Sequence, residues 1–142
     1  MSRGYSLIEC LIVIICGAIL LTVAVPNIQA FQQTWALWGG VKLVETSLYW
    51  GRMHAISSNS SMMFEVAGNG HEFWWTDPIS GLHFAGSVRR LDRVRIVSAP
   101  KHPLRFYQHG NAVPAGTYTI QGDIGSFSVI VSPGGRIRVQ KN

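Results

Sequence analysis

The sequence predicts an α+β protein in which one long N-terminal helix is followed by a head of antiparallel β-strands, arranged as a pair of sheets. In the first 60 residues, apolar residues are either continuous or recur at helical spacing, with few turn signals. Residues 61–142 instead carry short alternating segments separated by glycine- and proline-containing turns, which is typical of strands. The length of 142 residues suits one compact domain with an N-terminal appendage.

Residues 5–25 form an apolar segment that we expect to be a transmembrane helix. Leu, Ile, Val and Ala dominate it, and Glu9 is its single charged residue. At a rise of about 1.5 Å per residue the segment would extend roughly 30 Å, the thickness of a bilayer core. Arg3 lies on the short N-terminal side, which predicts that this end stays in the cytoplasm and the bulk of the chain is exported.

Residues 26–60 are expected to continue the same helix as an amphipathic segment. Gly39-Gly40 interrupts this segment, and two glycines inside a helix cost about 2 kcal/mol, which favours a local bend. The polar run at residues 57–61 is expected to end the helix, because its side chains compete for backbone hydrogen bonds. A stripe of apolar residues three and four apart is expected to pack in the core: Ile28, Phe31, Trp35, Trp38, Val41, Val44 and Leu48.

Residues 61–142 are expected to form the β-rich head domain. The turn at residues 68–70 joins two strands in a hairpin, and the turn at residues 132–135 joins the last two. In the last strand, Ile137 and Val139 point inward, whereas Arg136 and Arg138 point outward. Strands are expected at residues 61–67, 71–76, 82–85, 93–98, 104–107, 117–120, 126–132 and 136–140.

Positive charge is concentrated in the C-terminal part of the chain. Residues 89–142 carry nine Lys or Arg and two Asp, a net charge of +7, whereas residues 1–88 carry a net charge of −2. Such an imbalance favours an anionic partner, namely nucleic acid, an acidic protein surface or lipid headgroups, although a basic surface can also serve solubility alone.

The last strand is the best candidate for binding an anion. Arg136 and Arg138 lie two residues apart, so the roots of their side chains are about 6.6 Å from each other. With Lys141 they would form a row that could follow a phosphate backbone. On charge alone, the candidate surface extends to four further arginines: Arg89, Arg90, Arg93 and Arg95.

Signals for catalysis and metal binding are weak. His71-Glu72 lacks the second histidine of an H-E-x-x-H motif, because position 75 is Trp, and the five histidines are scattered. The two cysteines, Cys10 and Cys16, both lie in the apolar segment and are six residues apart, so they do not face each other on a helix. We therefore expect no enzymatic activity, no cofactor and no metal site.

The stretch Arg3-Gly4-Tyr5-Ser6-Leu7-Ile8-Glu9, followed by the apolar segment, resembles the class III signal of type IV pilins and type II secretion pseudopilins. The resemblance implies a pilin-like fold and a leader peptide at residues 1–4. It implies that a prepilin peptidase cuts between Gly4 and Tyr5 and methylates the new amine on Tyr5. It also implies that Glu9 meets the N-terminal amine of a neighbouring subunit during assembly. Tyr5 replaces the usual Phe and keeps the aromatic character.

The C-terminal third resembles the GspH/FimT group of minor pseudopilins and minor pilins. Residues 51–59 also resemble the helix end of that group, whereas residues 60–100 match it only loosely. The matching residues are Phe106 with Gly110, Gly116-Thr117, the aliphatic run at residues 129–131, and Gly135-Arg136-Ile137-Arg138.

This resemblance implies a minor subunit that works in filament assembly near the tip of a pilus or pseudopilus. Its partners would be other minor and major pilins or pseudopilins in the bacterial inner membrane. In some FimT-like minor pilins of natural transformation, arginines of this C-terminal motif bind DNA, which points to Arg136 and Arg138. The secretion branch has the same motif without a DNA role, so the choice of branch stays open.

Three alternatives remain at this point, and one of them is that the N-terminal segment is an uncleaved signal anchor. Glu9 could extend to the membrane interface without a specific partner. The N-terminal segment could also be an ordinary signal peptide cut after Thr22-Val23-Ala24, which would make the chain a conventional exported periplasmic enzyme or binding module.

Overall fold

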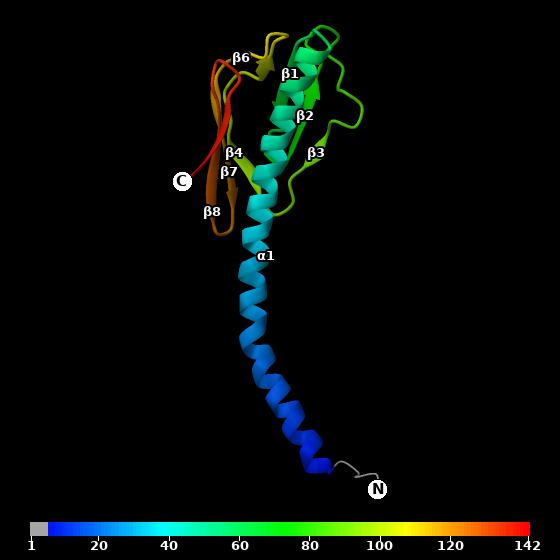
Figure 1. Cartoon of the computed structure of the whole chain (residues 1–142), viewed down its shortest axis with the longest axis vertical. Helices are drawn as coiled ribbons and strands as arrows, with labels where there is room; N and C mark the ends of the chain where they lie inside the picture. Colours follow the sequence, from blue (N-terminus) through cyan, green and yellow to red (C-terminus); the bar gives the residue numbers. More distant parts are fainter. Residues whose placement is uncertain (1–5) are drawn as a thin grey trace. The chain divides into compact units, whose positions relative to one another are not determined.

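A computed structural model describes residues 6–142, without the side chains of residues 23–27. The expected leader peptide, residues 1–4, and Tyr5 lie outside this description. Within it, helix α1 is followed by nine strands, β1 to β9 (Figure 1). The residues up to Gln32 and those from Gln33 to Asn142 form two compact units, and the second is called the head unit below.

Helix α1 spans Leu7–Ser57, which confirms one long N-terminal helix. Its first backbone hydrogen bond runs from the Glu9 amide to the Ser6 carbonyl, at 3.0 Å. At the other end, Asn59 adopts a left-handed conformation (φ 49°), which asparagine tolerates better than most residues. The helix therefore ends inside the polar run that was expected to stop it.

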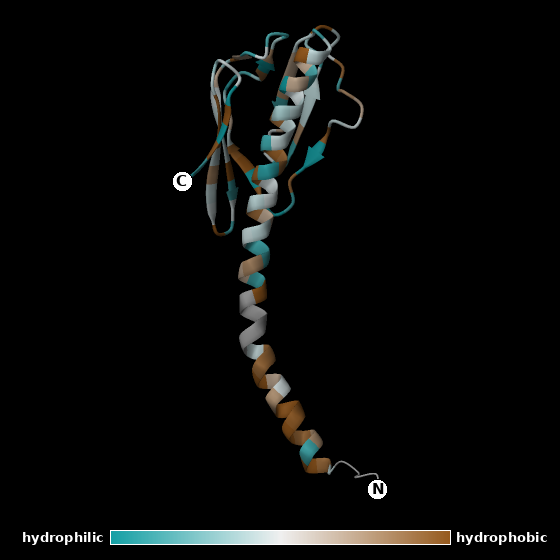
Figure 2. Ribbon diagram, viewed as in Figure 1, coloured by the Kyte–Doolittle hydropathy of each residue, from teal (hydrophilic) through white to brown (hydrophobic). Residues whose placement is uncertain are grey.

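Apolar residues dominate the first turns of α1, as Figure 2 shows. Their side chains are largely exposed, for example Leu7, Ile14 and Leu20. In the part of the chain that the structure describes, no helix combines the length and the apolar character that crossing a membrane requires.

The strands form two antiparallel sheets, as expected. The first sheet has five strands in the order β3-β2-β1-β5-β6, and the second has four in the order β4-β7-β8-β9. The first sheet contains β1 (Met62–Val66), β2 (Glu72–Thr76), β3 (Arg89–Arg90), β5 (Leu104–Phe106) and β6 (Ala112–Val113). The second contains β4 (Arg95–Ser98), β7 (Gly116–Gly122), β8 (Gly125–Val131) and β9 (Ile137–Lys141).

Three short segments differ from the expected strands. Residues 82–85 do not form a strand and make only an isolated bridge between Thr76 and His83. Gly81 and Gly86 flank this segment with positive φ angles, so the backbone turns on both sides of it. Strands β3 and β6 were missed, because two residues are too few to show an alternating pattern.

The core lies where α1 packs on both sheets of the head unit. Helix residue Trp38 contacts Phe127 of the second sheet, with 4.8 Å between ring centroids. Gly51 of the helix lies over the Trp75 ring of the first sheet. The main buried residues are Val41, Val44, Leu48, Phe64, Phe73, Trp75, Leu104, Phe106, Tyr118, Ile120, Val129 and Val131.

The expected core stripe is only half correct. Val41, Val44 and Leu48 are buried, but four residues that precede them are exposed: Ile28, Phe31, Trp35 and Trp38. Trp35 is 63% exposed and Trp38 is 45% exposed. The helical pattern continues beyond the point where the sheets cover the helix, so spacing alone could not separate core residues from surface residues.

The Gly39-Gly40 pair has two different roles. The helix continues through both residues, and Gly39 faces open space. Gly40 is buried, and a Cβ there would overlap the Val94 side chain. Gly40 therefore allows the loop before β4 to approach the helix closely.

Candidate interaction surface

The C-terminal hairpin is formed by β8 and β9, in which Ile130 pairs with Arg138 and Val131 with Ile137. Its turn is closed by backbone hydrogen bonds from Gly135 to Ser132 and from Ser132 to Arg136, both at 2.9 Å. The Ser132 hydroxyl also accepts a hydrogen bond from the Arg136 amide, at 3.1 Å. These bonds define the backbone on which Arg136 and Arg138 are presented.

Gly135 packs against two segments that are distant in sequence. A Cβ at Gly135 would overlap the Gly110 carbonyl and would lie 2.7 Å from Arg52 Nε. Arg52 Nε donates a hydrogen bond to that same carbonyl, at 2.9 Å. Gly110 and Gly135 both have positive φ angles, of 78° and 73°. Both positions therefore favour glycine, and Gly135 also needs it for space.

The three motif segments of the sequence thus meet at one place: residues 51–59, residues 106–110 and residues 135–138. Sequence reasoning identified each segment separately but did not predict this contact. The glycines of the C-terminal motif have a structural role that does not depend on any ligand.

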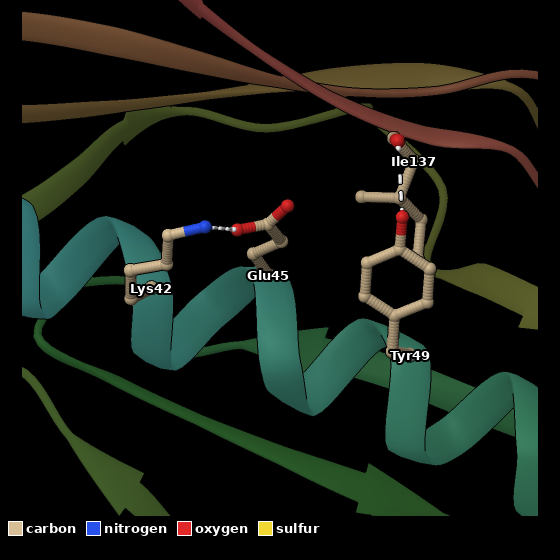
Figure 3. Close-up of polar contacts among 4 residues, drawn as sticks. All are labelled: Lys42, Glu45, Tyr49 and Ile137. Atoms are coloured by element: carbon tan, nitrogen blue, oxygen red, sulfur yellow. Dashed lines mark hydrogen bonds and ion pairs between the residues drawn. The ribbon is translucent and has the colours of Figure 1, made fainter.

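Strand β9 is also held to the helix. The Tyr49 hydroxyl donates a hydrogen bond to the Ile137 carbonyl, at 3.4 Å (Figure 3). Over the two preceding turns, Lys42 pairs with Glu45 at 2.7 Å, as the same figure shows. Lys42 is mostly exposed, so this ion pair contributes little to stability.

Arg136 and Arg138 are exposed and lie two residues apart, so they share one face of the hairpin. The intervening Ile137 is buried in the core. Among the described residues, neither guanidinium has a carboxylate within ion-pair distance. Both charges are thus available to an external anion.

The other predicted basic residues lie elsewhere. By strand alternation Lys141 shares the face of Ile137 and Val139, so it does not extend the row of Arg136 and Arg138. Strand β3, residues 89–90, is an edge of the other sheet and lies on the far side of α1 from β9 in Figure 1. The structure therefore does not place Arg89 and Arg90 beside the hairpin.

Arg93 and Arg95 lie at a third place. They line an open hollow of about 520 Å³ together with His71, Val94, Gln121, Gly122 and Asp123. Arg93 has a φ of 61°, which is uncommon for a residue other than glycine. Seven basic residues were predicted to form the anion-binding surface. In the structure, Arg136 and Arg138 share one face of the hairpin, and Arg93 and Arg95 share one hollow.

Glu9 lies in the first turn of α1 and its side chain is exposed. A carboxylate there is favoured by the partial positive charge of a helix N-terminus. Gly4 and Tyr5, the residues of the expected cleavage site, lie outside the described residues.

In residues 6–142, no three His, Cys, Asp or Glu side chains gather as metal ligands would. Asp77 has a pKa below its ordinary value, first because the Ile79 backbone N–H donates to it and then because the Ser80 hydroxyl does. This is the hydrogen bonding of a turn and does not indicate catalysis.

Comparison with known proteins relates the chain to pilin-like proteins. Residues 1–25 match the prokaryotic N-terminal methylation motif. No curated protein matches the sequence. The type IV minor pilin FimU of Pseudomonas aeruginosa is similar in structure, with a TM-score of 0.63 and 20% identity over 78% of this chain and 92% of that one.

A second solved structure is also similar, the minor pseudopilin EpsH of the type 2 secretion system of Vibrio cholerae. Its TM-score is 0.61, with 12% identity over 74% of this chain and 96% of that one. The chain therefore has the fold of the minor pilins and minor pseudopilins. Together with the methylation motif, this confirms the resemblance to GspH/FimT-like minor pilins.

Proposed function

We propose that the chain is a minor subunit of a type IV pilus or a type II secretion pseudopilus, acting in filament assembly near the tip. One observation carries the proposal: an N-terminal methylation motif at residues 1–25 includes the start of a long helix, and the chain that follows has a two-sheet head with the minor pilin fold. The motif relates the chain to processing by a prepilin peptidase, and the fold relates it to pilin and pseudopilin partners.

The proposed location is the bacterial inner membrane. Residues 5–25 would form a single membrane-spanning anchor with the N-terminus in the cytoplasm and the head in the periplasm, until assembly extracts the subunit into a filament. The sequence supports this through the methylation motif and through Arg3 on the short N-terminal side.

The processing step is tested by mass spectrometry of the full chain produced with and without a prepilin peptidase. With the peptidase, the mature chain should lack residues 1–4 and carry one added methyl group on Tyr5. Without the peptidase, residues 1–4 should remain. A mature chain that starts near Val25 would instead show an ordinary signal peptide and refute the proposal.

Glu9 is proposed to pair with the methylated amine of a neighbouring subunit. A carboxylate in an apolar environment is costly unless it is paired, so docking of the next subunit would relieve that cost. Glu9→Val should leave cleavage and membrane association intact but reduce incorporation into sheared filaments, whereas Glu9→Asp should retain more incorporation. Equal incorporation of wild type and Glu9→Val would show that the carboxylate is not needed.

A second candidate function is DNA binding by the C-terminal hairpin. The exposure of Arg136 and Arg138 on one face, without carboxylate partners among the described residues, favours it. Duplex DNA binding should be measured at several salt concentrations, because phosphate contacts make affinity depend on salt. Changing both arginines to glutamine should weaken binding and lower the salt slope by about 2.

The matched control is Arg89→Gln with Arg90→Gln, which removes the same charge from the other sheet. Loss of binding only in the hairpin variant supports the hairpin as the DNA site. Equal loss in both variants indicates a general charge effect, and no loss in the hairpin variant refutes the hairpin as the DNA site.

A further inference from the structure

The hollow beside β4 is lined by positively charged residues. Arg93 and Arg95 both line it, together with His71. Both arginines are exposed, and neither has a carboxylate within ion-pair distance among the described residues. Asp123 is the opposing charge on the lining. Arg93, Arg95 and Asp123 together give the lining a net charge of +1.

The position of this hollow in the head unit is defined by contacts with α1. A Cβ at Gly122 would lie 3.2 Å from Val94 and 3.4 Å from Leu37. A Cβ at Gly40 would overlap Val94. The hollow therefore lies beside helix residues 37–40, at the end of the head unit that follows the N-terminal segment of α1.

The same turns of the helix expose aromatic side chains. Trp35 and Trp38 are 63% and 45% exposed, and with Thr34, Gly39 and Lys42 they line an apolar hollow of about 590 Å³. Helical spacing places Trp35 on the side of α1 opposite the buried Leu37, Val41 and Val44. The aromatic hollow and the contacts of Val94, which lies between the two arginines, thus involve the same turns of the helix, residues 34–42.

Tryptophan together with arginine or lysine at one level is the composition of membrane interfaces. We propose that these residues form an interfacial belt that contacts the phosphate groups of anionic lipids before the subunit enters a filament. The belt consists of Trp35, Trp38, His71, Arg93 and Arg95. This inference rests on the membrane anchor proposed above and goes beyond it by assigning a lipid-binding role to the head.

The belt follows the proposed anchor closely in sequence. Trp35 lies ten positions after Val25, the last residue of the segment proposed to span the membrane. The headgroup layer adds about 5–8 Å on each side of the hydrocarbon core, and the long side chains of Trp and Arg can extend toward it.

The test uses the full chain reconstituted into vesicles whose lipids carry bromine near the headgroup, a quencher of tryptophan fluorescence. One set of vesicles contains phosphatidylcholine alone, and the other also contains phosphatidylglycerol. The quenching due to the belt is the difference between the wild type and a variant with Trp35→Phe and Trp38→Phe. It should be larger with phosphatidylglycerol and should fall as salt is added, because salt screens exposed charges.

Arginine variants show whether the hollow is responsible. Arg93→Gln with Arg95→Gln should weaken the surface association about 30-fold in anionic vesicles, from about fivefold per basic residue. Arg136→Gln with Arg138→Gln removes the same charge from the other end of the second sheet and should have no effect. Asp123→Asn removes the opposing charge and should strengthen the association.

The outcomes separate this inference from the proposed anchor. Failure of the chain to stay in the vesicles after an alkaline wash would refute the anchor. If the chain stays anchored, two results would refute the belt. One is equal quenching with and without Trp35 and Trp38, and the other is an unchanged surface association in Arg93→Gln with Arg95→Gln. The belt is also refuted if inorganic phosphate or duplex DNA, but not phosphatidylglycerol, protects these arginines from a guanidinium-modifying reagent.

Discussion

Replacing Gly51 with alanine tests the packing of the helix on the first sheet. A Cβ at this position would lie 2.6 Å from Trp75 Cζ3 and closer still to Cζ2 and Cη2, whereas ordinary contacts are 3.4–4 Å. The Trp75 ring would have to move by about 1 Å, and overpacking of this kind costs about 1–3 kcal/mol. Trp75 is 2% exposed, and Phe64 and Phe106 pack beside its ring and oppose movement toward them.

The net effect is the difference of two terms. Three carbons of the Trp75 ring would clash with the new Cβ, so we take the overpacking cost at the upper end of this range, about 3 kcal/mol. Alanine also favours the helix over glycine by about 1 kcal/mol. Gly51→Ala should therefore destabilise the fold by about 2 kcal/mol and lower the Tm by about 7 °C.

The assay is thermal unfolding of the full chain in detergent micelles, followed by near-ultraviolet circular dichroism. Gly39→Ala is the matched control, because Gly39 is in the same helix but faces open space. It should stabilise the fold by about 0.5–1 kcal/mol. If Gly51→Ala is as stable as Gly39→Ala, the Trp75 ring does not pack under the helix as described. Combining Gly51→Ala with Trp75→Leu should recover part of the loss, since the two changes share one contact.

Two further changes test the turns. Gly135→Ala should destabilise the fold by about 2 kcal/mol or more, because its Cβ would overlap the Gly110 carbonyl and its φ is positive. Gly134 faces open space, so Gly134→Ala should have little effect. Equal Tm values for the two variants would contradict the contact between Gly135 and Gly110. The lowered pKa of Asp77 means that its ionised form stabilises the fold above about pH 4, and that this stabilisation is lost as the pH falls through the lowered pKa. Asp77→Asn should therefore flatten the dependence of Tm on pH in this acidic range, and an unchanged profile would show that the turn does not contribute.

Periodicity predicted the elements with long patterns and missed those without one. Strands β1, β2, β7, β8 and β9 each have at least five residues, enough to show alternation or a continuous apolar run. Strands β3 and β6 have two residues each and exist because neighbouring strands supply hydrogen-bond partners. The segment at residues 82–85 looked like a strand, but glycines with positive φ turn the chain on both sides of it.

For the basic residues, too, the sequence predicted only part of the arrangement. Strand alternation predicted from the sequence that Arg136 and Arg138 share an exposed face, because they lie two residues apart on one strand. Charge alone could not separate them from Arg89, Arg90, Arg93 and Arg95, because these arginines lie on other elements and their location depends on strand order. The hollow of Arg93 and Arg95 brings residues of β4 together with the β7–β8 turn, which no local pattern indicates.

By itself, the sequence determined the long helix, the two-sheet antiparallel head, the N-terminal signal and the outward face of the last strand. These depend on local spacing and on short motifs, which adjacent residues encode. Only the tertiary structure decided that Trp35 and Trp38 are exposed although they continue the apolar stripe, and that Arg52, Gly110 and Gly135 meet. Such contacts join residues far apart in the chain, so they follow from the way the helix packs on both sheets and not from the spacing within any one segment.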